Sequence, residues 1–363
     1  MTDERKLNQL KGKKAMFLHM ALARITGAIA VFLGDPGIGK TEITKTVADL
    51  GITNLPPGLD RASLPPNWRP DVYHVYVSQH DNIEFMLPFI HPVTGEYSII
   101  PSPLLTRLKP GYFLVYDECT LEGMQQSMLQ QCSGDRISMG DWVGPPGTRI
   151  MIGNKAENAN FSFVCNSILM NRTKFYEWEP CDIEWMEDFA LPYGIHPLVG
   201  VGVKMNPKQL FCDFKPSRER NCTPRSITGA SDDLFAVENF FGNVKVPNHI
   251  VAEVLAGRMP DPAVREFMAL YSLMDKVVPY QTIIANPAGC VIPTNPSARF
   301  MTTVNVARRG IEEDWEKIYT WALRLPIEER GGVIEPILKR HPNLYATREG
   351  QSYQADKSAL VAA

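Results

Sequence analysis

The chain has 363 residues, of which 44% are hydrophobic and 21% are charged, as in an ordinary globular protein. That length is enough for two domains. A formal net charge of −3 excludes an overall basic field that would attract nucleic acid or an anionic membrane. The seven cysteines include no C-x-x-C pair, so we expect reduced thiols in a cytoplasm, with no disulfide framework or zinc cluster.

A basic stretch followed by an apolar one, residues 11–23, imitates the start of a signal peptide. His19 and Arg24 interrupt the apolar part, and no small-residue cleavage site follows. The pattern therefore predicts a helix whose packed face carries Phe17, Leu18, Ala21 and Leu22. No apolar run reaches the roughly 20 residues of a membrane span, so we expect a cytoplasmic protein with no membrane partner.

Residues 31–41 form an apolar strand that runs into G-x-x-x-x-G-K-T, the phosphate-binding loop of nucleoside triphosphatases. Its glycines allow a tight turn in which backbone N–H groups meet phosphate oxygens. Lys40 would place a positive charge on the β- and γ-phosphates, and the Thr41 hydroxyl would be a ligand of Mg²⁺. A helix over residues 40–50 would point its N-terminal dipole at the same anion. The expected cofactors are ATP and Mg²⁺, and the expected cofactor-binding residues are Gly34, Asp35, Pro36, Gly37, Ile38, Gly39, Lys40, Thr41 and Glu42.

Two hairpins are predicted further along this part of the chain. A β-branched and aromatic run predicts a strand at residues 72–77, and a short helix is expected at 81–87. The first hairpin, at 91–99, is equally well a contact device or a plain solvent loop. A helix at 123–133 then leads to the second hairpin, at 136–145.

Residues 111–118 combine a buried strand with two carboxylates at its end, Asp117 and Glu118. The carboxyl end of such a strand is where α/β folds bind ligands. Asp117 would hold Mg²⁺ through the water shell of the ion, and Glu118 would polarise the attacking water as a general base. After a complete phosphate loop, this pair is the expected partner of the bound nucleotide.

Two further polar residues follow. The strand at 149–154 ends in Asn154, whose amide would orient the water beside Glu118, unless it is a plain turn residue. The strand at 173–178 completes five parallel strands. Arg172 precedes it and would reach a phosphate, unless it is only a solvated charge at a helix end.

The second half of the chain has mainly helical patterns. Residues 191–222 are rich in Pro, Gly and charge without periodicity and predict a linker. Thr223-Pro224 marks a helix start and opens a mainly α-helical domain at 223–345. A frayed polar tail is expected at 346–363, and the nucleotide-binding core is expected at 1–190.

The order of these motifs resembles that in AAA+ ATPases over roughly residues 12–345. The two hairpins and the sequence motifs GDPGIGKTE … LVYDE … ILMNR … PRS also resemble those of the MoxR-like branch, found in bacteria and their phages. This resemblance implies an α/β, P-loop NTPase core, an αβα sandwich with a five-stranded parallel sheet, and a C-terminal helical lid. It also implies a bacterial or phage-infected host cytoplasm.

The resemblance implies roles for single residues. Asn154 would be the first sensor of the γ-phosphate, Arg172 the finger that reaches the ATP of the neighbouring subunit, and Arg225 the second sensor in the lid. A ring, usually a homo-hexamer, is implied because the next subunit completes the site. This chain has Gly153-Asn154-Lys155 where the family has Thr-x-Asn-Pro, and Asn171-Arg172-Thr173 where it has Asp-Arg-Phe. Both keep the polar or cationic group, so hydrolysis is expected.

The leading interpretation is a chaperone-like ATPase that hydrolyses ATP at the subunit interfaces of a ring and remodels or activates a partner protein. MoxR-like proteins commonly work with a separate protein bearing a von Willebrand factor A domain, and this chain has no D-x-S-x-S metal motif of its own. A nucleic-acid-associated motor or loader is a second class, which the negative net charge and the scarcity of Lys and Arg in the hairpins disfavour. A nucleotide-dependent assembly switch is a third.

Overall fold

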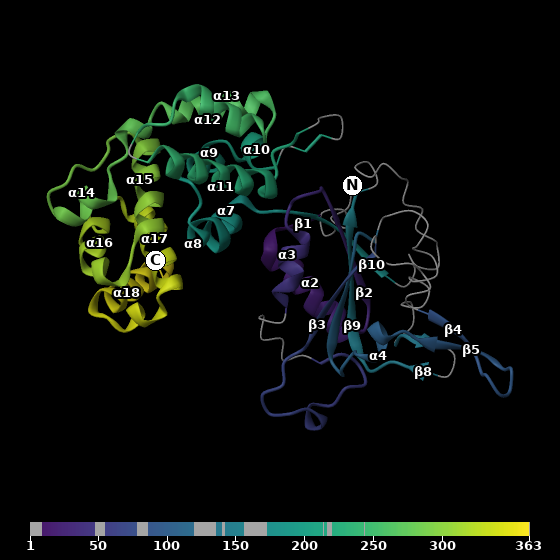
Figure 1. Cartoon of the computed structure of the whole chain (residues 1–363). Helices are drawn as coiled ribbons and strands as arrows, with labels where there is room; N and C mark the ends of the chain where they lie inside the picture. Colours follow the sequence, from purple (N-terminus) through teal and green to yellow (C-terminus); the bar gives the residue numbers. More distant parts are fainter. Residues whose placement is uncertain are drawn as a thin grey trace, which may run out of the picture. The chain divides into compact units, whose positions relative to one another are not determined.

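A computed structural model describes residues 9–47, 55–77, 86–119, 136–139, 142–155, 173–212, 214–215, 220–242 and 244–362. The chain forms two compact units, unit 1 at residues 1–180 and unit 2 at residues 181–363 (Figure 1). The predicted end of the nucleotide-binding core, residue 190, therefore lies within unit 2. The physical reason is that Met186 and Ala190 pack into the hydrophobic core of that unit.

Unit 1 is built on a parallel sheet of six strands in the order β1-β10-β2-β9-β6-β3. The strands are β1 (Gln9–Lys11), β2 (Ile29–Gly34), β3 (Val72–Tyr76), β6 (Tyr112–Asp117), β9 (Gly147–Asn154) and β10 (Thr173–Glu179). Every residue of β6 is buried, as in a sheet covered on both faces. The five predicted strands and the α/β P-loop fold are confirmed. β1 was not predicted, because three residues are too few to show a periodicity.

Helix α2 (Gly12–Thr26) packs on β1, β2, β9 and β10. Its buried stripe is formed by Met16, Met20 and Ala23, which follow one another at helical spacing. Leu18 and Leu22 are exposed, so the predicted packed face (Phe17, Leu18, Ala21, Leu22) is wrong. The helix carries two adjacent apolar stripes, and periodicity alone does not tell which of them the sheet covers.

The last turn of α2 is fastened to the sheet by a buried arginine. Arg24 donates hydrogen bonds of 3.0 Å to Thr148 Oγ1 and to the Gly111 carbonyl, and it lies 4.5 Å from the ring centre of Phe113. Burial lowers the pKa of Arg24 to about 10. These contacts hold the beginnings of β6 and β9, at the edge of the sheet opposite the phosphate loop.

Both predicted hairpins are present in unit 1. The first pairs β4 (Met86–Ile90) with β5 (Tyr97–Pro101), and the second pairs β7 (Ser138–Met139) with β8 (Trp142–Val143), each antiparallel. The predicted helix at 81–87 is wrong at residues 86–87, because they pair with β5 and so begin a strand. Residues 81–85 and the predicted helix at 123–133 lie outside the described residues. Short helices η2 (Arg61–Ser63) and α4 (Pro103–Thr106) complete the described elements, apart from α3 after the phosphate loop.

The described part of unit 2 is mainly helical, as predicted. Its elements are α7 (Asp182–Trp185), the π-helical turn η6 (Met186–Ala190), α8 (Leu191–Tyr193), α9 (Pro197–Met205), α10 (Pro207–Leu210), α11 (Pro224–Phe241), α12 (Asn248–Ala256), α13 (Asp261–Tyr271), η7 (Met274–Lys276), α14 (Tyr280–Ala285), α15 (Pro296–Arg309), η8 (Glu312–Asp314), α16 (Trp315–Ala322), α17 (Ile327–Arg340), η9 (Pro342–Ala346) and α18 (Arg348–Ala362). The predicted cap of α11 is confirmed, because the Thr223 side chain accepts from the Ser226 N–H and Ser226 accepts from the Thr223 N–H.

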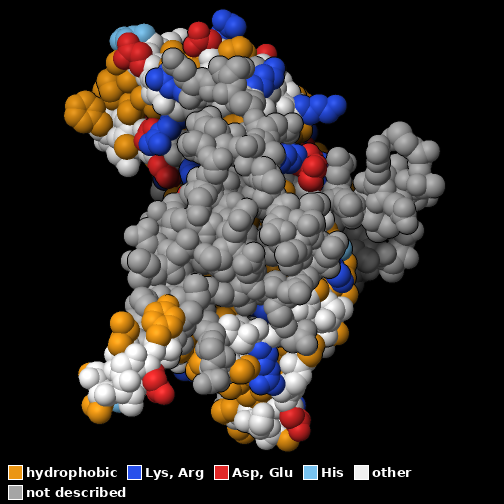
Figure 2. All heavy atoms as spheres, turned by 90° about the vertical axis from the view of Figure 1, so that its right-hand side faces the viewer, with side chains coloured by type: hydrophobic (Ala, Val, Ile, Leu, Met, Phe, Trp, Pro, Cys, Tyr) orange, Lys and Arg blue, Asp and Glu red, His pale blue; other side chains and the backbone are white. Residues whose placement is uncertain are grey.

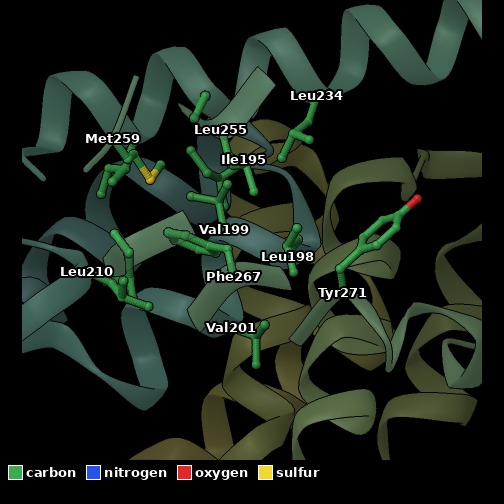
Figure 3. Packing of buried hydrophobic residues seen from close by; sticks show 14 of the residues in the cluster. Ile195, Leu198, Val199, Val201, Leu210, Leu234, Leu255, Met259, Phe267 and Tyr271 are labelled. Atoms are coloured by element: carbon green, nitrogen blue, oxygen red, sulfur yellow. The ribbon is translucent and has the colours of Figure 1, made fainter. Parts of the chain in front are cut away.

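The predicted linker at 191–222 is wrong. Within it, α9 is buried from Pro197 to Val203 and lies at the centre of the core of unit 2. Figure 3 shows Leu198, Val199 and Val201 of this helix beside Phe267 of α13. From Pro197 to Val203 the helix is apolar on all sides, and its two glycines lower the helical propensity of the segment. A helix surrounded by other helices needs no polar face, so the amphipathic pattern is missing.

The predicted frayed tail at 346–363 is also wrong in its main part, since α18 is helical from residue 348 to residue 362. Tyr353 packs against a hydrophobic cluster of unit 2, and its hydroxyl donates a 2.8 Å hydrogen bond to Glu335 of α17. This contact with a distant residue orders a segment whose composition is polar. In the parts of the chain that the structure describes, no helix is long and apolar enough to span a bilayer.

Candidate nucleotide-binding site

The phosphate loop connects β2 to helix α3 (Lys40–Lys45), and its glycines adopt the backbone angles that the motif requires. Gly37 has φ 76° and Gly39 has φ 98°, both in the left-handed region that favours glycine. A side chain at Gly34 would approach the Trp178 carbonyl to 2.6 Å, so this position also needs glycine. The predicted helix at 40–50 is helical to Lys45, and residues 48–50 lie outside the described residues.

Lys40 is buried at the beginning of α3, and its ammonium points into the loop. It donates hydrogen bonds to the carbonyl oxygens of Gly34 (2.9 Å) and Asp35 (2.8 Å) and to Asn154 Oδ1 (3.3 Å). A buried charge has to be paired or hydrogen-bonded. The loop thus holds an ammonium group at the place where the motif binds the β- and γ-phosphates.

The predicted metal ligands are brought together at the end of β6. The Thr41 hydroxyl donates a 2.6 Å hydrogen bond to Asp117 Oδ2, and the Glu118 N–H donates one of 2.8 Å to Asp117 Oδ1. Asp117 is buried. A hydroxyl and a carboxylate side by side are oxygen ligands suited to Mg²⁺, which binds few protein groups and keeps several waters. The donor set therefore fits the predicted ion.

Glu118 has an unusual backbone conformation, with φ 60°. Among the described residues it is the only one other than glycine with a positive φ. Such strain persists only where the surrounding structure imposes it, and it gathers at functional sites. Here the Cys119 N–H is held by the Ile152 carbonyl at 3.1 Å, so the chain turns sharply after Asp117 and leaves the Glu118 side chain exposed.

Asn154 stands beside the loop because of strand register. β9 pairs with β2 so that Asn154 lies opposite Gly34, the first residue of the motif. Its amide oxygen thereby reaches Lys40. In the sheet, β9 separates β2 from β6, so Asn154 lies between the phosphate loop and the end of β6.

Ile38 and Glu42 belong to the phosphate loop and to α3, whereas Arg225 belongs to unit 2. Ile38 is buried and packs close to Gly34, and Glu42 is paired with Lys45 at 2.8 Å on the exposed side of α3. Arg225 is exposed in α11 of unit 2. Arg172 lies outside the described residues.

One charged residue near the loop was missed as a site residue. Lys155 follows Asn154, and only 16% of its side chain is exposed. Its ammonium lies 3.8 Å from Glu177 Oε2 and 4.0 Å from Glu179 Oε1. The signal in the sequence is a lysine directly after Asn154, where the resembled family has proline.

No family model matches this sequence, and no curated protein is similar to it at a significant level. Solved structures with a similar arrangement include two single-residue variants of RuvB from Thermotoga maritima. Both are 15% identical to this chain, and both matches cover 95% of it. One has a TM-score of 0.40 with 95% of the RuvB chain covered, and the other has a TM-score of 0.38 with 93% covered. NtrX from Brucella abortus, in complex with ATP, is 13% identical with a TM-score of 0.38, covering 76% of this chain and 63% of its own. Similarity at this level carries no functional argument.

The structure itself shows an α/β P-loop fold in which Lys40, Thr41, Asp117 and Asn154 meet at one edge of the sheet.

Proposed function

We propose that this protein is a MoxR-like AAA+ ATPase that hydrolyses ATP with Mg²⁺. The observation that carries the proposal is the pair of contacts joining three strand ends at the phosphate loop. Thr41 meets Asp117 at 2.6 Å, and Lys40 meets Asn154 at 3.3 Å. Phosphoryl transfer requires a phosphate loop, a carboxylate that can hold a metal ion and a polar group that can contact the γ-phosphate. The site contains all three.

Each residue has a distinct task in this proposal. Lys40 and the backbone N–H groups of the loop hold the phosphates, and Thr41 and Asp117 hold Mg²⁺, which neutralises phosphate charge when bound. Glu118 accepts the proton of the attacking water. Glu118 directly follows Asp117 at the strand end, its backbone is strained, and its side chain is exposed. Asn154 orients the water or the γ-phosphate.

The assembly and the partner belong to the same proposal. We infer a homo-hexameric ring in which Arg172 serves the ATP of the neighbouring subunit and Arg225 acts from the helical lid. The action is chaperone-like, on a separate client or on a partner with a von Willebrand factor A domain. The support is the resemblance of the motifs, including the two hairpins that the structure contains.

The surface of the first hairpin favours a protein partner over nucleic acid. Val93 is 88% exposed, and Ile90 and Tyr97 are each 65% exposed. Residues 86–101 contain no Lys or Arg, whereas phosphate binding requires basic side chains. Figure 2 shows hydrophobic side chains on the surface of this side of the molecule. Exposed apolar side chains of this kind mark protein contacts.

The test of hydrolysis compares the unaltered protein with Glu118→Gln. The variant should bind ATP and Mg²⁺ with unchanged affinity while its turnover falls by about 100-fold or more, because the general base is lost. Glu96→Gln, which changes an exposed carboxylate of the β4–β5 loop, is the matched control and should keep its activity. Unchanged turnover in Glu118→Gln would refute the role of Glu118.

The test of the ring mixes two inactive variants. Arg172→Ala subunits keep the loop, and Lys40→Ala subunits keep the finger, so mixed interfaces should recover part of the activity. Sedimentation of the protein with and without ATP measures the assembly itself. Assembly without any recovery would show that Arg172 does not act across the interface.

A further inference from the structure

Lys155 bridges two strands across the first residue of the phosphate loop. It follows Asn154 at the end of β9 and holds Glu177 and Glu179 of β10 at 3.8 and 4.0 Å. β2 lies between these strands, so the bridge spans two strand spacings, about 10 Å. It crosses the sheet where β2 becomes the phosphate loop, because Gly34 is in register with Asn154.

This bridge is held weakly. Both distances exceed the 2.7–2.9 Å or so of a charge-assisted hydrogen bond. The side chains of Glu177 and Glu179 are 56% and 57% exposed, and pairs with exposed carboxylates contribute little to stability. The side chain of Lys155, by contrast, is only 16% exposed. A lysine is thus kept beside the loop by partners that a stronger anion can replace.

A triphosphate in the phosphate loop would be that anion. The Lys40 ammonium lies 3.3 Å from Asn154 Oδ1, so the phosphates that Lys40 binds arrive next to the residue preceding Lys155. A γ-phosphate carries more charge than one carboxylate and accepts charge-assisted hydrogen bonds from lysine. ADP lacks the γ-phosphate, which is the phosphate farthest from the nucleoside.

We propose that Lys155 binds the γ-phosphate of the bound nucleotide and leaves Glu177 and Glu179 when it does so. The inference rests on the proposed nucleotide-binding function. Its consequence for the chain is local to β10, because Glu179 precedes Pro180 and unit 2 begins at Cys181. Triphosphate binding thus removes the side-chain ion pairs at the end of the strand that leads into the helical unit.

The test measures the dissociation constants of fluorescent ADP and of a non-hydrolysable fluorescent ATP analogue, each with Mg²⁺, on the full chain. Lys155→Met should weaken binding of the ATP analogue by about tenfold and leave ADP within about twofold, because one charge-assisted hydrogen bond is lost. Lys155→Arg should retain most of the affinity. Lys174→Met, an exposed lysine at the other end of β10, is the matched control and should change neither constant.

A thermodynamic cycle then tests the exchange of partners. Glu177→Gln with Glu179→Gln should tighten binding of the ATP analogue by about threefold, because the competing carboxylates are gone. The same pair of changes should have no effect when Lys155 is methionine. Melting curves check folding, and if Lys155→Met does not fold, Lys155→Arg and the glutamine pair carry the test.

Three outcomes would overturn the inference: no change in Lys155→Met, an equal change for both nucleotides, or the same effect of the glutamine pair with and without Lys155. If the unaltered protein binds neither nucleotide, the proposed function fails together with this inference. If the unaltered protein binds both, Lys40→Ala binds neither, and Lys155→Met does not discriminate between them, only this inference fails.

Discussion

Thr41 Oγ1 lies 2.6 Å from Asp117 Oδ2, although 76 positions separate the two residues in the chain. The contact joins the first turn of α3 to the end of β6, so it fixes the phosphate loop against the sheet. The second oxygen of Asp117 accepts the N–H of Glu118 and sets the sharp turn after the strand. One buried carboxylate therefore orients both the predicted metal-binding hydroxyl and the predicted general base.

The first prediction concerns this carboxylate. Asp117→Asn should lower ATP turnover and shift its midpoint to a higher Mg²⁺ concentration, because an amide is a weaker ligand for a hard cation than a carboxylate. Turnover measured against Mg²⁺ concentration checks it. Asp71→Asn, an exposed carboxylate before β3, is the matched control and should leave the curve unchanged. The same Mg²⁺ midpoint in both variants would contradict the assignment of Asp117.

The second prediction uses the strained backbone of Glu118. With φ at 60°, a non-glycine side chain costs about 1 kcal/mol. Glu118→Gly should therefore have a free energy of unfolding about 1 kcal/mol higher than Glu118→Ala, and both should lack turnover. Urea denaturation and ATPase assays measure the two effects. At Glu253, exposed within α12, the order should reverse, because glycine weakens a helix. If the alanine variant were the more stable one at both positions, the backbone of residue 118 would not be strained.

The third prediction compares two glycines of α9. A side chain at Gly202 would lie 2.2 Å from Phe267 Cε1, and Phe267 is fully buried. Gly202→Ala should lower the free energy of unfolding by roughly 1–3 kcal/mol through overpacking. At Gly200 the nearest atoms, from Ile195 and Val304, stand at 3.5 Å, which is ordinary contact.

Gly200→Ala should accordingly raise the free energy of unfolding by about 0.5 kcal/mol, because alanine restricts the unfolded chain. Urea denaturation followed by circular dichroism distinguishes the two variants. Similar effects of both substitutions would mean that α9 does not pack on Phe267 as described.

The fourth prediction concerns pH and the attachment of α18. Burial by itself would raise the pKa of Glu335, but hydrogen bonds from Lys357 and Tyr353 outweigh it and lower the pKa below the ordinary 4.5. Because the folded-state pKa is the lower one, this carboxylate stabilises the structure fully above about pH 4.5. That contribution is lost as the pH falls through the folded-state value.

Hydrogen exchange of the α18 amides should therefore accelerate as the pH falls from 5 to 3, after correction for intrinsic exchange rates. Glu335→Gln should exchange fast throughout and lose this pH dependence. Glu349→Gln, in the first turn of the same helix, is the matched control and should keep it. Retention of the full pH dependence in Glu335→Gln would assign it to another group.

The sequence by itself determined the features that short stretches encode. The strand, glycine and lysine pattern of residues 31–41 specifies its own turn, because φ angles above zero select glycine locally. The apolar run ending in Asp117 and Glu118, and the Thr223 cap of α11, are equally local. For this reason the five strands and the loop were predicted correctly, while the roles of Arg172 and Arg225 stay predictions.

Only the tertiary structure decided which of several chemically equal surfaces is buried and which distant groups meet. It selected the methionine stripe of α2, and it placed residues 197–205, predicted as a linker, in the core of unit 2. It also brought Lys155 to Glu177 and Glu179 through a strand order that no local pattern contains. The physical reason is the same in each case. Burial and charge pairing depend on partners far away in the chain, whereas hydrophobic periodicity depends only on residues that are close together in the sequence.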